Sequence, residues 1–397
     1  MTKILITDSY SQNTGDVGIL MAMVQQLKQI SDLDLAIEAS SPDNLQHFDI
    51  FDDIKIYPRI FNISGLSEKS NWVSRISIYI TGLFDTFIFF VWAIFTRLRI
   101  PAIWLVRPSR QEQAAEYQNT DIFISAGGGF LSSYYTWQFR VQIYLVALIL
   151  RKKIMIFAQS VGPFNSIISR FIMKKVLNKV DIITIREPNS FEYLSSFNLD
   201  KPYHITADIA FLLDVNELKP KKNGSVAICV KAHPDKHKLK KYQKNIIKIS
   251  QYIIKHGSKI KIVSQTPADD ELCQYIVDKI GGKSEAILFG SDPRDIKGIY
   301  GMADFVIANR MHTIVFATET STPFIAISYE PKFDGLMSQL EYPDELLLGD
   351  TFSFDELQES VEYIMKHLEK LRYKLNDKMP EIKKHAHMNV SHLLSIL

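Results

Sequence analysis

The chain has 397 residues, of which 46% are hydrophobic and 23% are charged, and its formal net charge at pH 7 is +2. This is the composition of an ordinary folded protein, and the small net charge argues against extended nucleic-acid binding. The length exceeds what one hydrophobic core usually organises, so we expect two domains.

Cysteine usage and the N-terminal residues bear on the compartment. Cys229 and Cys273 both lie in apolar stretches that predict buried elements, so we expect no disulfide framework and a reducing environment. The first apolar run is interrupted at Asp8 and is too short for a signal peptide. We therefore expect a cytoplasmic protein.

Strands and helices alternate through the first half of the chain. Short apolar runs predict buried strands, and each is followed by a polar turn and a stretch with helical periodicity. The expected strands are 3–7, 33–39, 53–57, 121–125, 153–158, 182–185 and 206–213. Repeated units of this kind predict a mostly parallel sheet, and we assign residues 1–215 to an N-terminal α/β domain.

An apolar segment at 72–106 interrupts this pattern. It contains the run IYITGLFDTFIFFVWAIF between arginines, and residues 76–95 have the roughly 20-residue length that crosses a bilayer. Asp85 opposes a simple span, because a central carboxylate costs about 2.5 to 3.5 kcal/mol. Three interpretations stay open: helices buried in the domain, a helix lying in the plane of a membrane, and a transmembrane anchor.

A second series of strands and helices follows a cluster of Lys, Pro, Asn and Gly at 217–224, which we interpret as a linker. The expected strands are 225–230, 259–264, 286–289, 305–308 and 323–328. Residues 225–350 are predicted to form a C-terminal α/β domain. Residues 354–397 are predicted to form C-terminal helices that pack back on the first domain.

Charged side chains follow two neighbouring strands of the second domain. Arg310 and His312 come after one strand, and Glu330 and Lys332 come after the next. The carboxyl ends of parallel strands form one edge of a sheet, so we expect these side chains round one crevice that suits a small anion. A lone histidine is more often structural, but beside two cations His312 is better explained as a proton-transfer group.

Two loops of the first domain add candidates for substrate binding. Asn13 and Asp16 lie between the first strand and the first helix, where backbone N–H groups can hold an anion, although Asp16 also suits a helix N-cap. Gly128 and Gly129 have no side chains, so a ligand could approach the backbone closely there. They fit neither a dinucleotide fingerprint nor a P-loop, and a tight turn is the alternative.

Arg186 follows the strand at 182–185, and its planar guanidinium matches carboxylate or phosphate oxygens. An ion pair with Glu187 or Asp208 is the structural alternative. Gln159 and Ser160 begin a segment for which ligand contact and a tight turn are again the two interpretations. The histidines show no metal-ligand spacing, so we predict no metal.

The chain resembles the polysaccharide pyruvyl transferase family. The resemblance rests on an ordered set of motifs: Asn13-x-Gly15-Asp16, Gly127-Gly128-Gly129, Gln159-Ser160-Val161-Gly162-Pro163, Arg186-Glu187 with Ser190, Ala207-Asp208, Arg310-Met311-His312 and Pro331-Lys332-Phe333. Each motif is weak alone, and the set is fairly specific. The segment 71–107 matches none of them.

The resemblance implies two Rossmann-like α/β domains facing a central cleft, as in GT-B glycosyltransferases, and transfer of a pyruvyl group from phosphoenolpyruvate to a sugar as a ketal. The family's histidine and lysine fall on His312 and Lys332, and its phosphoenolpyruvate-binding arginines fall on Arg186 and Arg310. We expect His312, Lys332 and Arg186 to be catalytic, with the first domain on the acceptor side and the second on the phosphoenolpyruvate side. Phosphoenolpyruvate is then a co-substrate, and no cofactor is expected. The expected substrate-binding residues are Arg310, Asn13, Asp16, Gly128, Gly129, Gln159, Ser160 and Glu330.

The expected acceptor is a lipid-linked or nucleotide-linked glycan. In the lipid-linked case we expect 76–95 to contact the inner face of the cytoplasmic membrane. Two other functions stay open: a GT-B-type glycosyltransferase that uses a nucleotide sugar, and a non-catalytic homologue that binds glycan or lipid. The lack of a complete nucleotide loop disfavours the first, and the joint presence of Arg186, His312 and Lys332 disfavours the second.

Overall fold

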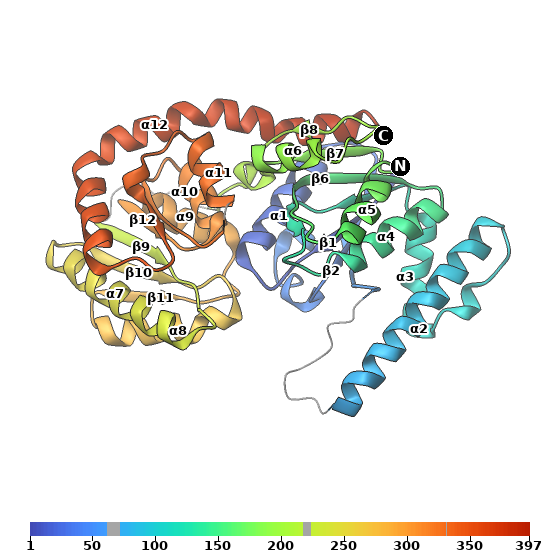
Figure 1. Cartoon of the computed structure of the whole chain (residues 1–397), viewed down its shortest axis with the longest axis horizontal. Helices are drawn as coiled ribbons and strands as arrows, with labels where there is room; N and C mark the ends of the chain where they lie inside the picture. The colour runs from blue at the N-terminus through green and yellow to red at the C-terminus, as the bar shows by residue number, and fades with distance from the viewer. Residues whose placement is uncertain (62–71, 217–223, 331) are drawn as a thin grey trace.

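The computed structural model describes residues 1–61, 72–216, 224–330 and 332–397, with all their side chains except those of 72–81 and 332. The chain forms two α/β halves that lie next to each other, each built round its own sheet (Figure 1). The strand order is β3-β2-β1-β4-β6-β7-β8 in the first sheet, with β5 paired to β6, and β11-β10-β9-β12-β13-β14 in the second. All strand pairs in the described ranges are parallel.

The first sheet is made from the short apolar runs of the first half. Its strands are β1 (Thr2–Ser9), β2 (Leu33–Ala39), β3 (Lys55–Pro58), β4 (Ile122–Ser125), β5 (Gly128–Leu131), β6 (Lys153–Val161), β7 (Ile182–Ile185) and β8 (His204–Ile205). The central strand β4 is buried along its whole length, as expected for a parallel strand covered on both faces. Ile4 of β1 is in register with Ile122 of β4, so both strands end at the same edge.

Helices cover both faces of this sheet. They are α1 (Thr14–Leu27), α2 (Trp72–Arg97), α3 (Pro108–Asn119), α4 (Gln138–Ile149), α5 (Ile167–Leu177) and α6 (Pro188–Ser195). Side chains of α2 to α6 share one hydrophobic cluster with strand residues on one face of the sheet. The side chains of α1 belong to another cluster, which continues into the second half.

Helix α1 joins the two halves. Asn13 caps it, since its side chain accepts a hydrogen bond of 2.8 Å from the Gly15 N–H. The helix is buried nearly all round because it packs between the first sheet and the helices α9 (Pro293–Met302) and α10 (Met311–Glu319). A Cβ atom on Gly18 would lie 2.8 Å from the Phe316 ring, so glycine permits this close crossing of α1 and α10.

The second sheet repeats the pattern with β9 (Ser225–Cys229), β10 (Lys259–Val263), β11 (Ser284–Ile287), β12 (Phe305–Ala308), β13 (Phe324–Ser328) and β14 (Leu347–Gly349). The helices α7 (Lys236–Lys255), α8 (Pro267–Ile280) and α11 (Lys332–Gln339) complete it together with α9 and α10. Strand β12 leads directly into α10, and β13 is followed by α11. Both transitions lie at the carboxyl edge of the sheet.

The long helix α12 (Phe354–Leu394) runs from the second half across to the first (Figure 1). A capping box formed by Ser353 and Glu356 starts it, and the backbone departs from helical geometry at His367. Near its end, Asn389 accepts a hydrogen bond of 2.8 Å from Thr206 and donates one of 3.0 Å to the carbonyl of Ala207. These buried hydrogen bonds fix the helix against the first half.

Several elements differ from those expected from the sequence. Residues 206–213 do not form a strand: a 3-10 turn, η4 (Ile209–Leu212), is capped by Asp208 and buried between the halves. The glycine segment expected as a loop contains the short strand β5. The edge strand β14 had no clear signal, because only three residues form it.

Helix α2 has two apolar faces with different surroundings. Phe89, Trp92 and Ala93 are buried against the first half, whereas Phe84 and Phe87 are exposed. Asp85 forms an ion pair of 2.8 Å with Arg107, which explains a carboxylate within this apolar run. No helix in the described part of the chain is long and apolar enough to cross a membrane.

Candidate functional site

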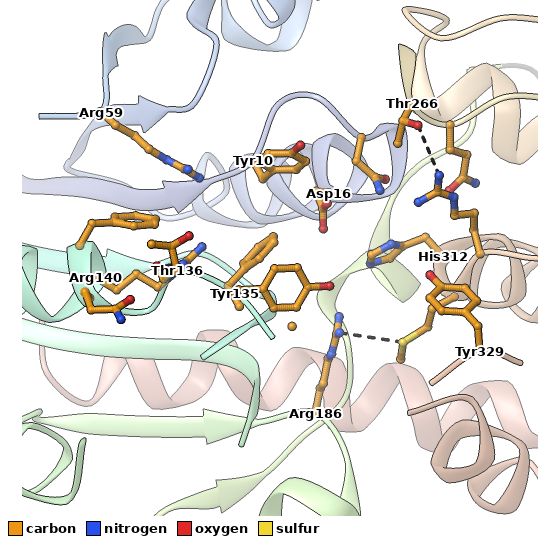
Figure 2. Close-up of a pocket in the computed structure, with 18 of the residues that line it drawn as sticks. Tyr10, Asp16, Arg59, Tyr135, Thr136, Arg140, Arg186, Thr266, His312 and Tyr329 are labelled. Carbon is orange, nitrogen blue, oxygen red and sulfur yellow. Dashed lines mark hydrogen bonds between the residues drawn. The ribbon is translucent and has the colours of Figure 1, made fainter. Parts of the chain in front are cut away.

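A cavity of about 570 Å³ lies between the two halves, and the carboxyl edges of both sheets contribute to it. Figure 2 shows side chains from both halves pointing into it. The first half supplies Tyr10, Asn13, Asp16, Arg59, Phe61, Gly129, Phe130, Tyr135, Thr136, Gln138, Phe139, Arg140 and Arg186. The second half supplies Gln265, Thr266, Arg310, Met311, His312 and Tyr329.

His312 lies in the first turn of α10 and lines the cavity where the halves meet. Its side chain is buried, with Nε2 3.8 Å from Oδ2 of Asp208. The ring also lies against the backbone of Gly15, so one half holds the imidazole that the other half supplies. The N-terminal end of α10 lies beside it, and backbone N–H groups there favour an anion.

Arg186 enters the cavity from the end of β7 and is buried. Its Nε donates a hydrogen bond of 2.9 Å to Ser160 Oγ, and its Nη1 donates to Asp208. Burial opposes the charge, but the carboxylates of Asp208 and Glu187 outweigh it and raise the pKa of Arg186 above its usual value. Nη2 makes a weak contact of 3.9 Å with Met311 Sδ, which leaves this nitrogen directed at the cavity.

Arg310 precedes α10 and has a comparable arrangement in the second half. Its Nη2 donates to Asp269 and, at 3.3 Å, to Thr266 Oγ1. Burial lowers its pKa, and the charge of Asp269 more than compensates, so the net direction is upward. The site thus holds two guanidiniums whose charge is secured by buried carboxylates, and each keeps donors for a ligand.

Aromatic side chains form the middle of the cavity wall. Tyr10, Phe130 and Tyr135 contact in series, with ring centroids 6.2 Å and 5.8 Å apart. Burial, followed by the charges of Glu330 and Asp16, raises the pKa of Tyr135 to about 12, so its hydroxyl stays protonated at neutral pH. Such rings suit the faces of a sugar, and the hydroxyl can donate a hydrogen bond.

The structure brings most of the sequence-predicted residues into one site. The cavity is lined by Asn13, Asp16, Gly129, Arg186, Arg310 and His312. Gln159 and Ser160 lie behind this wall: Gln159 donates to Ser125 at 3.2 Å, and Ser160 accepts from Arg186. Glu330 is half-buried after β13 and outside the lining. The side chain of Lys332 lies outside the described residues, so its role stays a prediction.

Two loop residues act differently from what the sequence indicated. Asp16 is not the N-cap of α1, because Asn13 takes that position and Asp16 lines the cavity. Gly128 has a φ of +147°, and a Cβ atom there would lie 2.3 Å from the Phe130 ring. Gly128 therefore permits the turn that positions Phe130, and its neighbour Gly129 faces the cavity.

Several lining residues were missed in the sequence. Gln265 and Thr266 follow β10, and Tyr329 follows β13, so the strand-exit rule that identified Arg310 would also have identified them. Arg140 lies within α4 and carries no such signal. In the described part of the chain, no group of three or more His, Cys, Asp or Glu side chains is arranged to hold a metal ion.

The fold is similar to that of sugar-nucleotide enzymes of known structure. UDP-GlcNAc 2-epimerase from Neisseria meningitidis bound to UDP-GlcNAc aligns with a TM-score of 0.63 and 12% identity, covering 99% of this chain and 100% of that one. The S. aureus MnaA–UDP structure aligns with a TM-score of 0.58 and 15% identity, covering 94% and 90% of the two chains. Phytolacca americana UGT2 aligns with a TM-score of 0.59 and 11% identity, covering 100% and 99%. These similarities confirm the expected GT-B-like architecture.

Sequence comparison identifies the family. The amylovoran biosynthesis protein AmsJ of Erwinia amylovora is 23% identical over 378 residues, which are 86% of this chain and 87% of that protein. The polysaccharide pyruvyl transferase profile matches residues 13–331, a range that contains the four arginines and the histidine of the cavity. The resemblance seen in the sequence motifs is thereby confirmed, and the chain belongs to the polysaccharide pyruvyl transferase family, whose members are polysaccharide-modifying transferases.

Proposed function

We propose that the protein transfers the pyruvyl group of phosphoenolpyruvate to two hydroxyls of a sugar in a polysaccharide precursor, forming a cyclic ketal and releasing phosphate. The observation that supports this most is the grouping of His312 with Arg186 and Arg310 in one interdomain cavity. A titratable imidazole beside two arginines, whose positive charges are stabilised by buried carboxylates, suits a reaction that needs proton transfer on an anionic donor.

Donor binding is the task of the cations in this scheme. Phosphoenolpyruvate carries a phosphate and a carboxylate, and the guanidiniums of Arg186 and Arg310 offer planar pairs of donors for such groups. The N-terminal end of α10 adds backbone donors. Lys332, at the start of α11, is proposed as a further cation for the departing phosphate.

Proton transfer is the proposed task of His312. The imidazolium donates a proton to the methylene carbon of the donor, and a sugar hydroxyl attacks the adjacent carbon. The C–O bond to phosphate then breaks, and a second hydroxyl attacks the same carbon to close the ketal. Of the two hydroxyl protons, one restores His312 and the other leaves with phosphate, so the protons balance. Asp208, 3.8 Å from Nε2, stabilises the imidazolium.

A donor assay tests this function against its strongest rival. The purified chain is incubated with phosphoenolpyruvate and a panel of lipid-linked and nucleotide-linked sugars. Phosphate release and the methyl NMR signal of the ketal are then measured. The rival, a nucleotide-sugar glycosyltransferase, is suggested by the likeness to enzymes whose structures contain UDP. Nucleotide release without phosphate release from phosphoenolpyruvate would establish that rival and overturn the proposal.

We further propose that the protein acts at the inner face of the cytoplasmic membrane and docks there through α2 and α5. Phe87 of α2 is 63% exposed and Ile167 of α5 is 88% exposed, so large apolar side chains face solvent on both helices. Arg97, Arg99, Lys175 and Lys179 are exposed near them, which suits anionic lipid headgroups. Helix α4 packs against both helices, so α2, α4 and α5 belong to one layer of the first half (Figure 1).

A further inference from the structure

The cavity extends beyond His312 into the first half, where Arg59 and Arg140 line it. In Figure 2 these two arginines lie at the end away from His312, with Tyr135 between. We propose that Arg59 and Arg140 form a second anion site, which binds the phosphate or diphosphate ester that activates the acceptor sugar. This inference rests on the proposed function and specifies the chemical class of its acceptor.

Arg140 is a buried cation whose charge is balanced from within the protein. Its side chain is 3% exposed, its Nη1 donates a hydrogen bond of 2.8 Å to the Thr136 carbonyl, and its Nε lies 3.6 Å from Oδ1 of Asp8. The other oxygen of Asp8 accepts hydrogen bonds of 2.6 Å from Ser125 and 3.0 Å from Tyr144. Ser125 and Tyr144 therefore hold the Asp8 carboxylate in place beside Arg140.

Arg59 forms no such ion pair with a carboxylate of the described residues, although the charge of Asp8 also acts on it. Its Nη2 donates hydrogen bonds to the carbonyls of Asp8 and Ser9, at 3.3 Å and 2.9 Å, and its Nε is buried without a hydrogen-bond partner among the described residues. The nearby Glu38 is fully buried, which raises its pKa to about 7, so this carboxyl is only partly ionised at neutral pH. The two guanidiniums thus share the charge of Asp8, and Arg59 receives further contributions only from the partly ionised Glu38, Tyr10 and Asp16 of the cavity wall.

The surroundings keep both charges oriented without neutralising them. The guanidinium carbons of Arg59 and Arg140 lie 4.8 Å and 4.3 Å from the centre of the same Phe139 ring. Burial lowers the pKa of Arg59, and it lowers that of Arg140 to about 10, as expected for cations short of compensating charge. A bound dianion would supply the missing charge in a poorly solvated place, where charge-assisted hydrogen bonds are strong.

The order of groups along the cavity explains why this anion belongs to the acceptor. Arg186 and Arg310 already serve the donor beside His312, so the hydroxyls that receive the pyruvyl group must also lie at that end. A sugar held against Tyr135 with its hydroxyls towards His312 directs its anomeric oxygen the other way. An activated sugar carries its phosphate on that oxygen, which brings the phosphate to Arg59 and Arg140.

Both lipid-linked and nucleotide-linked sugars carry this phosphate, and the apolar end of the cavity favours the lipid-linked form. Phe61 lines that end and packs against Phe89 and Phe90 of α2, with ring centroids 5.6 Å and 6.1 Å apart. The neighbouring face of α2 carries the exposed side chains proposed to contact a bilayer. A lipid diphosphate bound at Arg59 would therefore have its chain near that helix.

The test measures pyrophosphate binding to the whole protein by calorimetry, with saturating phosphoenolpyruvate present to occupy the donor end. We expect pyrophosphate to bind, and Arg59→Met to weaken it by at least about tenfold while Arg59→Lys retains part of the affinity. Arg151→Met, a change of an exposed arginine on the same half that lies outside the cavity lining, serves as control and should leave the affinity within about twofold. Far-UV circular dichroism verifies the fold of each variant.

The outcomes separate this inference from the proposed function. Failure of phosphoenolpyruvate itself to bind would overturn the proposed function. Phosphoenolpyruvate binding with pyrophosphate binding absent, or unaffected by Arg59→Met, would overturn the second anion site alone. Binding of glucuronate to the same protein without binding of pyrophosphate would also overturn it, because the site would then recognise a sugar carboxylate. A polyisoprenyl diphosphate in detergent and UDP are the two supporting competitors, and the tighter one identifies the carrier.

Discussion

Gly15 of the first half lies so close to His312 of the second that a Cβ atom on Gly15 would fall 2.3 Å from the imidazole Nδ1. Real side chains do not approach so closely, so Gly15→Ala must displace the ring or part the two halves. Because a displacement of about 1 Å can cost roughly a hundredfold in rate, we expect a fall of that order in ketal formation. Gly282→Ala is the matched control, since nothing lies within 4 Å of its added Cβ. A fully active Gly15→Ala protein would contradict the placement of His312 at the reaction centre.

His312→Gln removes the proposed proton donor while keeping a polar side chain of similar reach. We expect turnover to fall by roughly a hundredfold or more, since general acid–base groups contribute about 10² to 10⁴. Phosphoenolpyruvate should still bind, because Arg186 and Arg310 remain. Phosphate release measures the first effect and calorimetry the second. His387→Gln, on an exposed position of α12, is the control, and equal turnover in the two variants would exclude the proposed role.

Asp208→Asn removes the carboxylate that pairs with Arg186 and lies near His312. Removing one partner of a buried ion pair leaves the other charge uncompensated, so we expect a loss of about 3 to 5 kcal/mol in the free energy of unfolding. Bound phosphoenolpyruvate should restore part of this stability by supplying negative charge to Arg186. Thermal unfolding with and without the ligand measures both effects. Asp200→Asn at the surface is the comparison, and equal melting temperatures would show that the pair contributes no stability.

Glu38 makes stability depend on pH in a defined direction. Burial raises its pKa to about 7 from the usual 4.5, so the folded state holds a proton that the unfolded state releases. The stabilisation is complete below pH 4.5 and is lost as the pH rises through about 7, by up to about 3 kcal/mol. Urea unfolding at pH 5 and pH 8 measures this loss. In Glu38→Gln the difference between the two pH values should shrink, and an unchanged difference would assign it to other groups.

The membrane surface predicts binding to anionic vesicles. The wild-type chain should sediment with vesicles that contain phosphatidylglycerol, less at high salt, and little with phosphatidylcholine alone. Replacing Phe84 and Phe87 together by Ser, or Phe171 by Ser, should weaken this by at least about tenfold, since each ring contributes apolar area. Tyr373→Ser is the control, because this exposed residue lies on α12, away from α2 and α5. Equal binding by all variants would exclude these helices as the contact.

The main parts of the site were predictable because parallel sheets bring successive strand ends to one edge. Arg186, Arg310 and His312 all follow strands, and that rule identified them without knowledge of their partners. Arg140 was not predictable, because it lies within a helix and becomes a lining residue only through the packing of α4 against the sheet. The run 206–213 resembles a strand because most of its residues are apolar. Its burial comes from contact with α1, α10 and α12 instead.

The path of α12 also fixes when the cleft can form during synthesis. Buried side chains near its end, Met379, Ile382, Ala386 and Leu393, share one core with the first half, and Asn389 supplies hydrogen bonds to Thr206 and Ala207. The first half therefore emerges from the ribosome before α12, the helix that packs against it. A nascent chain stopped after the second sheet would contain His312 and Arg186 but would lack the contacts between α12 and the first half. The contacts that hold the two halves together are thus complete only after α12 has been synthesised.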